Sequence, residues 1–152
     1  MRRSPRSPIT KAFADASGYY ALLREHDQNH REATAILAYL TDHRARLYTT
    51  RYVLAETHAL LVKKTPKLPP PEAFRLLRAI EQDESTTLVP VTAADEAEAR
   101  QILARYVDQP FSLTDAISFA VMTRLGLQYA FTFDRRDFQT YGITCLTSAF
   151  LR

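Results

Sequence analysis

Short apolar runs alternate with longer stretches of helical periodicity along most of the chain. The short runs are the length of buried strands, and the longer stretches place apolar residues on one helical face. This alternation predicts an α/β domain with a central, mostly parallel sheet. The predicted strands are Ala12–Asp15, Leu47–Thr50, Leu88–Val91, Tyr129–Phe133 and Ile143–Leu146, and the predicted helices are Gly18–Glu25, Asn29–Asp42, Arg51–Lys63, Glu72–Asp83, Ala94–Tyr106 and Leu113–Leu125.

Proline and glycine mark several of the expected boundaries. The proline-rich segment Lys64–Pro71 predicts a turn, and Pro71 suits the first position of the helix that follows, where no intrahelical hydrogen bond is lost. Gly126 is well placed to end a helix in the left-handed conformation. Pro90 either argues against the third strand or marks it as an edge strand, because proline cannot donate to a ladder.

The length of 152 residues predicts one compact domain. We expect a disordered basic tail over residues 1–10 and a single domain over residues 11–152. Apolar runs are too short to cross a membrane, and the basic N-terminus lacks the apolar stretch of a signal peptide, so a cytoplasmic protein is expected. Cys145 is the only cysteine, which excludes an internal disulfide and favours a small buried side chain.

The net charge of +3 and the pI near 9.1 are compatible with an anionic partner such as nucleic acid. The charge balance does not demand such a partner, because three of the twenty basic residues lie within the first six positions. With three glycines and no glycine-rich phosphate loop, nucleotide binding of that kind is disfavoured.

Two acids stand directly after predicted strands. Asp15 ends the first strand and Asp134 follows the fourth, so both are expected at the carboxyl edge of the sheet, where ligands of open α/β sheets bind. An aspartate at such a position can also serve a turn or cap a helix. Taken singly, each residue leaves both interpretations open.

Two further acids lie in predicted helices. Glu56 shares a helical face with Val53 and Leu60, which places it on the apolar stripe, where an unpaired carboxylate is costly. Asp115 completes a capping-box pattern that begins at Ser112, and it also faces the core side of its helix. A capping role and a functional role are both open for Asp115, with function favoured.

All four acids map to one edge of the predicted sheet, although they come from separate segments. Such a set repels itself unless hard cations lie among its members, and Mg²⁺ or Mn²⁺ prefers oxygen ligands of this kind. None of the four histidines stands in a metal-ligand motif. The pattern therefore predicts a magnesium or manganese site that acts on a polyanion.

Four motifs in order make the chain resemble the PIN-domain ribonucleases, and more narrowly the VapC-type toxins of bacterial toxin–antitoxin pairs. They are Phe13–Ser17, Val53–Glu56, Leu113–Ser118 and Phe131–Phe138. The resemblance runs from about Lys11 to the C-terminus. It implies a three-layer α/β/α PIN-like fold around the parallel sheet and an endoribonuclease that depends on Mg²⁺ or Mn²⁺.

Carried over by position, the resemblance makes Asp15, Glu56, Asp115 and Asp134 the catalytic and metal-binding acids. It assigns supporting hydroxyls to Ser17 and Thr132, with Asp137 as a further supporting acid or a turn cap. Hydrolysis would use a metal-activated water. Two basic residues next to the site are the best candidates for RNA phosphate contacts, Arg135 and Arg136.

The resemblance also implies a homodimer and a cognate antitoxin protein that silences the site, with RNA as substrate and no membrane partner. A housekeeping RNA-processing nuclease and a non-catalytic module that binds RNA or protein remain alternatives. A phospho-receiver domain is disfavoured because no lysine follows Lys67. A phosphatase of the Asp-x-Asp type is disfavoured because Ser17 occupies the place of its second acid.

Overall fold

The computed structural model describes residues 7–152. Five parallel strands form one sheet in the order β3-β2-β1-β4-β5. The elements in chain order are β1 (Lys11–Ala14), α1 (Ala16–Leu23), α2 (His30–Asp42), β2 (Arg46–Thr49), α3 (Arg51–Lys63), α4 (Pro70–Gln82), β3 (Thr86–Leu88), α5 (Ala93–Arg105), α6 (Leu113–Leu125), β4 (Tyr129–Phe131), α7 (Arg135–Tyr141) and β5 (Thr144–Cys145). The predicted α/β class and the parallel sheet are confirmed.

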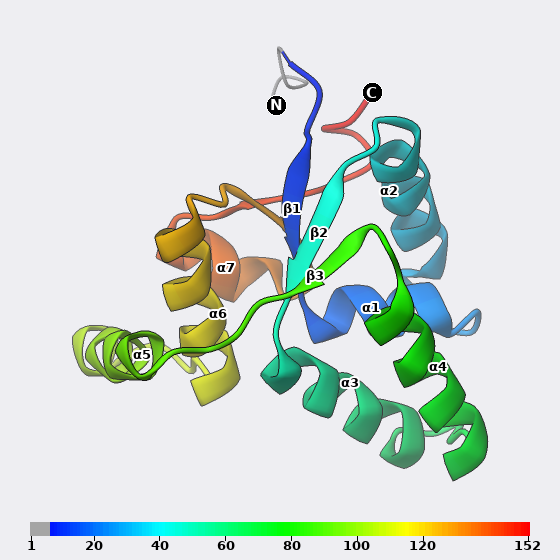
Figure 1. The fold of residues 1–152 in the computed structure, drawn as a ribbon, viewed down its shortest axis with the longest axis horizontal. Coiled ribbons are helices and arrows are strands. Elements are labelled where there is room, and N and C mark those ends of the chain that lie inside the picture. Colours follow the sequence, from blue (N-terminus) through cyan, green and yellow to red (C-terminus); the bar gives the residue numbers. More distant parts are fainter. Residues whose placement is uncertain (1–6) are drawn as a thin grey trace.

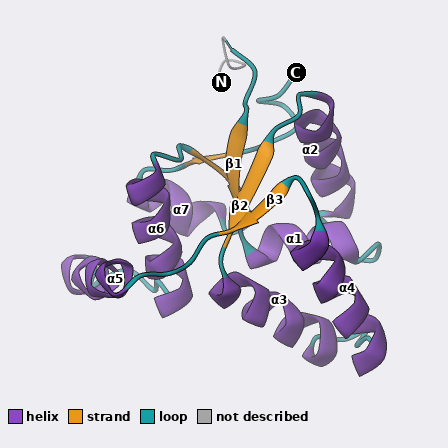
Figure 2. Cartoon of the chain, in the orientation of Figure 1, coloured by secondary structure: helices purple, strands orange, loops and turns teal. Residues whose placement is uncertain are grey.

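The helices cover the two faces of the sheet in two groups. In Figure 1, α1, α2, α3 and α4 lie on one side of the strands, whereas α5, α6 and α7 lie on the other. Figure 2 shows the strands as a thin layer between these two groups of helices. The three-layer α/β/α arrangement is therefore as predicted. Since every strand is parallel, all carboxyl ends meet at one edge of the sheet.

The core explains how α6 and α7 are held against this edge. Phe119 of α6 is fully buried, and its ring packs edge-on against Phe138 with centroids 5.0 Å apart. It also stacks on Tyr141 at 4.5 Å. These aromatic contacts fix the only buried face of the short helix α7, and they thereby set the position of the residues that begin it.

Several boundaries differ from the sequence-based expectations. The helix α7 was not predicted, because Phe138 is its only buried residue and seven residues are too few for a periodic pattern. The strand β3 lies two residues earlier than expected and ends before Pro90, which removes the conflict between proline and a ladder. It is an edge strand, one of the two possibilities that Pro90 had left open. Gly126 ends α6 with φ of 66°, as predicted.

The ordered domain starts earlier than the predicted boundary at residue 11. Ile9 is only 3% exposed and its amide donates to the Tyr39 hydroxyl at 3.3 Å, while the carbonyl of Thr10 accepts from Arg46 at 2.9 Å. Residues 9 and 10 thus belong to the domain and not to a tail. Ser7 and Pro8 are exposed, and the remainder of the predicted tail, residues 1–6, lies outside the described part of the chain. Within residues 7–152, every helix is too short or too polar to span a bilayer.

Candidate active site

Asp15 and Asp134 lie at the carboxyl edge of the sheet, each at the N-cap position of a helix. Asp15 follows β1 and precedes α1, and Asp134 precedes α7. Neither side chain makes a cap hydrogen bond to its helix. The amides of Ala16 and Ser17 still favour the charged form of Asp15, so capping is weakened as the explanation for Asp15 and is absent for Asp134.

Two hydroxyls hold the Asp15 carboxylate in place. Ser17 donates to Oδ2 of Asp15 at 3.1 Å, and Thr132 donates to the same oxygen at 2.9 Å. The hydroxyl oxygens of Ser17 and Thr132 are 3.0 Å apart. Each also accepts a backbone N–H, from Phe133 to Ser17 and from Asp134 to Thr132. The supporting hydroxyls that the resemblance implied thus connect the loop after β4 to the start of α1.

Gly18 permits the close approach of α1 to β4, a role that we had not predicted from the sequence. A Cβ at position 18 would lie 2.4 Å from the carbonyl oxygen of Phe131, which is backbone and has little freedom to move. Only glycine lets the first turn of α1 pack directly on β4. The sequence did contain a signal for this role, because Gly18 is one of only three glycines and stands three residues after Asp15, at the end of the first strand.

Asp115 serves as a cap and also faces the other acids. Its Oδ2 accepts from the Ser112 amide at 3.1 Å, and its own amide donates to the Ser112 hydroxyl at 3.0 Å, which completes the capping box. The side chain is nevertheless buried. Oxygens of Asp115, Asp134 and Asp137 all lie within 4.8 Å of one another. The two interpretations of Asp115 are therefore compatible.

Asp137 is more central than the sequence suggested. It lies in the first turn of α7, three residues after Asp134 and on the same side of the helix. Because α7 was not predicted as a helix, this spacing carried no meaning at the level of sequence. The helix brings Asp137 into the acidic group with Asp115 and Asp134.

Glu56 does not lie on the buried stripe of α3, contrary to the sequence-based expectation. The buried residues of this helix are Val53, Leu54, Thr57 and Leu61, and Glu56 is exposed at their margin. It lies near enough to Asp15 and Asp115 for their charges to raise its pKa, although it is not among the acids whose oxygens lie within 4.8 Å of one another. Tyr52, one turn earlier, donates to Glu96 of α5 at 2.7 Å and connects the two helical layers near this margin.

Burial raises the carboxylate pKa values of Asp15, Glu56, Asp115 and Asp134, and neighbouring negative charges add to this effect at the last three. Burial raises the pKa of Asp15, and it raises that of Asp115 with a contribution from the Asp15 charge. The pKa of Glu56 rises to about 6, through partial loss of hydration at the margin of the helix and through the charges of Asp15 and Asp115. The pKa of Asp134 rises to about 7, through burial and the charges of Asp115, Asp137 and Asp15.

No cationic side chain within residues 7–152 forms an ion pair with any of these five acids. In addition, Oδ1 of Asp15 is buried and has no hydrogen-bond partner. An orphaned carboxylate oxygen at the base of an unneutralised acidic group is costly unless a cation binds there. The donor set consists of carboxylate oxygens alone, which suits Mg²⁺ or Mn²⁺. The residues present therefore fit a divalent metal.

The two arginines after Asp134 differ in their availability. Arg135 pairs with Glu32 of α2 at 3.0 Å, donates to the Leu146 carbonyl at 3.2 Å, and lies 4.8 Å above the Phe133 ring. Its guanidinium thus helps to hold the chain around Asp134. Arg136 is exposed and makes no ion pair within the described residues.

The chain matches the PIN domain family over residues 12–143. It is 32% identical over 130 residues to the 23S rRNA-specific endonuclease VapC20 of Mycobacterium tuberculosis, covering 86% of this chain and 93% of that protein. The crystal structure of VapC20, described as a sarcin–ricin loop cleaving toxin, superposes with a TM-score of 0.79 at 30% identity, over 90% of this chain and 98% of the other. FitAcB from Neisseria gonorrhoeae superposes with a TM-score of 0.62 at 16% identity, over 91% and 98%, which shows the fold.

The fold and the acidic edge of the sheet thus belong to a known class of protein. The chain is a member of the PIN domain family. Within that family it is of the VapC type, as the extent of its similarity to VapC20 shows.

Proposed function

We propose that this protein is a metal-dependent endoribonuclease and the toxin of a type II toxin–antitoxin pair. The observation that carries the proposal is the group formed by Asp115, Asp134 and Asp137, with Asp15 and Glu56 near enough to interact with it through their charges. No counter-cation of the described residues pairs with these acids, and Oδ1 of Asp15 is buried without a hydrogen-bond partner. Support from outside the site comes from VapC20, which is named a 23S rRNA-specific endonuclease and shares most of its length with this chain.

In this proposal, Asp15, Glu56, Asp115 and Asp134 hold Mg²⁺ or Mn²⁺, and Asp137 supports them. A bound divalent cation lowers the pKa of water and stabilises the charge that develops on a scissile phosphate. Ser17 and Thr132 orient Asp15 so that Oδ1 remains free for a ligand. Asp115 stays in place because its capping hydrogen bonds anchor it to the first turn of α6.

Incubation of the purified protein with total RNA, with Mg²⁺, Mn²⁺ or EDTA, tests the proposed activity. We expect cleavage with either metal and none with EDTA, because four mutually repelling carboxylates offer no other source of a nucleophile. Asp15→Asn protein, prepared in parallel, controls for contaminating ribonucleases. Cleavage that persists in EDTA, or that is equal in the Asp15→Asn preparation, would contradict the proposal.

We further propose a cytoplasmic homodimer that a cognate antitoxin silences by placing a basic side chain among the acids. An arginine suits this role, because its guanidinium pairs bidentately with carboxylates and stays charged at cellular pH. Expression of the chain alone should then slow growth, whereas expression of the Asp15→Asn variant should not. Equal growth of the two strains would favour a housekeeping RNA-processing nuclease instead.

A further inference from the structure

The turn between α3 and α4 carries an unpaired basic surface. No acid occurs between Glu56 and Glu72, and three lysines lie in this interval, namely Lys63, Lys64 and Lys67. All three are exposed, and no carboxylate within residues 7–152 lies in ion-pairing distance of them. By contrast, five arginines of the described residues form ion pairs with acids, namely Arg51, Arg78, Arg105, Arg124 and Arg135.

The turn that presents these lysines is rigidly held. Leu68 is buried in a small second core with Tyr20 and Leu61, and its amide donates to the Leu61 carbonyl at 2.9 Å. Arg24 donates to the Pro66 carbonyl at 2.7 Å. The Lys64 ammonium lies 4.6 Å from the centroid of the Tyr20 ring. A fixed platform lowers the entropic cost of binding a ligand, so these charges are pre-organised.

Helical geometry places Lys63 in line with the acidic group. Glu56 and Lys63 are seven residues apart in α3, which is two turns and therefore the same helical face. The rise between them is about 10 Å at 1.5 Å per residue. This separation corresponds to about three phosphates along one strand of a duplex, whose charges are spaced about 3.4 Å along the axis.

We infer that the exposed face of α3, from Glu56 to the Lys63–Lys67 turn, is a track for the RNA backbone on one side of the scissile phosphate. This inference rests on the proposed function, since it concerns where the substrate runs. Lysine contacts to phosphate position a nucleic acid and read no sequence. The track therefore contributes affinity for the strand, and the acidic group performs the chemistry.

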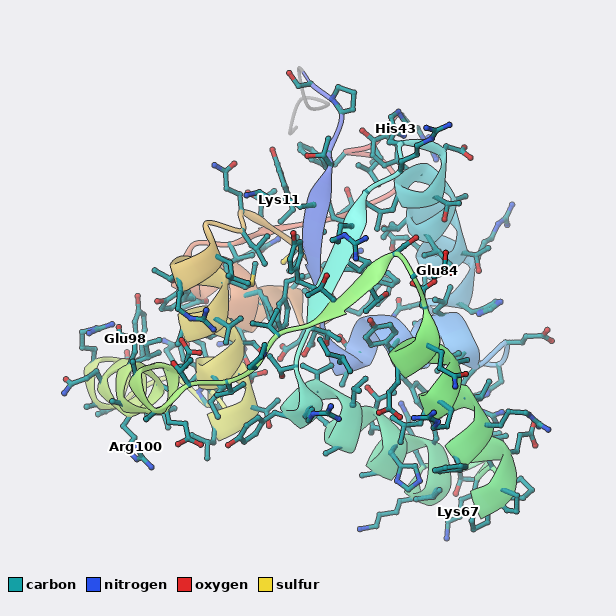
Figure 3. All side chains as sticks on the ribbon, viewed as in Figure 1. Lys11, His43, Lys67, Glu84, Glu98 and Arg100 are labelled. Carbon is teal, nitrogen blue, oxygen red and sulfur yellow. The ribbon has the colours of Figure 1, made fainter. Side chains whose placement is uncertain are left out.

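The test uses the double variant Lys63→Gln/Lys67→Gln and leaves Lys64 in place, because Lys64 packs on Tyr20. The matched control is Lys11→Gln/Arg44→Gln, which removes the same charge from exposed residues at the amino ends of β1 and β2. Figure 3 shows Lys67 at the far end of the α3–α4 pair and Lys11 at the opposite end of the molecule. Thermal melts verify that both variants fold.

Binding of a fluorescein-labelled RNA hairpin is measured in the Asp15→Asn background across a range of salt. We expect the lysine variant to lose about tenfold in affinity near physiological salt and to lower the slope of log K against log salt by about 1.5, at 0.7 to 0.9 per phosphate contact. The control pair should change neither quantity measurably. In the active protein, the loss should appear in KM rather than in kcat.

A lysine variant that matches the control in both affinity and slope would overturn the inference. Loss of binding to anionic lipid vesicles, with RNA binding unchanged, would overturn it as well. Failure of the proposed nuclease function can be distinguished from failure of the RNA track, because the binding assay needs no cleavage. A protein that binds the hairpin through Lys63 and Lys67 but never cleaves RNA would contradict the nuclease assignment and leave the track in place.

Discussion

Asp95 and Asp115 occupy the same local position in two neighbouring helices, yet their electrostatic environments are opposite. Each is the third residue of its helix, each completes a capping box with the residue before the helix, and each is buried. Asp95 also accepts two hydrogen bonds from Arg124, both at 2.8 Å, and this contact holds its pKa below the usual range. Asp115 has no such partner, and burial raises its pKa.

This comparison separates an acid with a structural role from one that we propose to be functional. The capping hydrogen bonds are the same in kind and account for the presence of an acid at both positions. What differs is the tertiary neighbour, since Asp95 faces an arginine of α6 whereas Asp115 faces Asp134 and Asp137. A buried acid surrounded by other acids must either take up a proton or bind a cation from outside the chain.

The largest expected effect is the loss of catalysis when an acid of the candidate site is replaced, and it distinguishes Asp115 from Asp95. Asp115→Asn and Asp134→Asn should each lower kcat/KM for RNA by at least about a hundredfold, because even residues that only support a metal site cost 10–100-fold when they are changed. Asp95→Asn should leave the activity of the folded protein within about threefold, since its carboxylate binds only Arg124 and the amide of Thr92. Initial rates with a labelled RNA hairpin measure these effects. Equal losses in the Asp95 and Asp115 variants would break the distinction.

On stability, Asp95→Asn should have the larger effect and Asp115→Asn the smaller one, the reverse of their order in catalysis. Asp95→Asn should lower the free energy of unfolding by about 2 kcal/mol, less than the 3–5 kcal/mol typical of a broken buried pair, because Arg124 is 39% exposed and can be hydrated. In EDTA, Asp115→Asn should leave stability unchanged or raise it, since the amide keeps the cap acceptor and relieves repulsion. Urea unfolding of both variants decides this. A loss of about 1 kcal/mol for Asp115→Asn with activity intact would make Asp115 a cap only.

The effect of pH on the free energy of unfolding should be smaller than the effects of these substitutions. Its sign should differ between metal-free and metal-loaded protein. The folded-state pKa values of Glu56 and Asp134 are raised to about 6 and about 7, so the stability that their protonation provides is complete below about pH 4. In EDTA this stability is lost as the pH rises through about 6 to 7, by on the order of 1 kcal/mol after solvent screening. With saturating Mg²⁺, stability should instead rise over the same range, because metal binding needs ionised carboxylates. Urea titrations at several pH values, with and without Mg²⁺, test both signs.

Most of the fold followed from periodicity, and the failures have a common cause. The long helices and the five strands have enough apolar residues to reveal their period, so six helices and the parallel sheet were predictable. The helix α7 has one buried residue, Phe138, and its N-terminal half consists of charged residues. Its contribution to the fold comes from aromatic contacts with α6, which no local pattern contains.

The sequence indicated which residues belong to the candidate site, but not how exposed each side chain would be or which partner it would have. Asp15 and Asp134 could be placed at the sheet edge because strands end there. The exposure of Glu56 could not be foreseen, because Val53 and Leu60 suggested a buried face that in fact centres one residue further, on Thr57. The engagement of Arg135 with Glu32 likewise depends on a contact between residues distant in sequence. Such long-range pairings decide which charged side chains lack an ion-pair partner, and local patterns in a single sequence do not reveal them.

Calorimetric titration of metal-free protein with Mn²⁺ tests the central claim most directly, because it requires neither the RNA nor a partner. The account predicts saturable binding to the wild-type protein, a loss of at least about tenfold in affinity for Asp115→Asn, and no significant change for Asp95→Asn. The paired aspartate thus serves as the internal control for the unpaired one. Absence of saturable Mn²⁺ binding, or an equal loss in both variants, would contradict the assignment of this sheet edge as a metal centre.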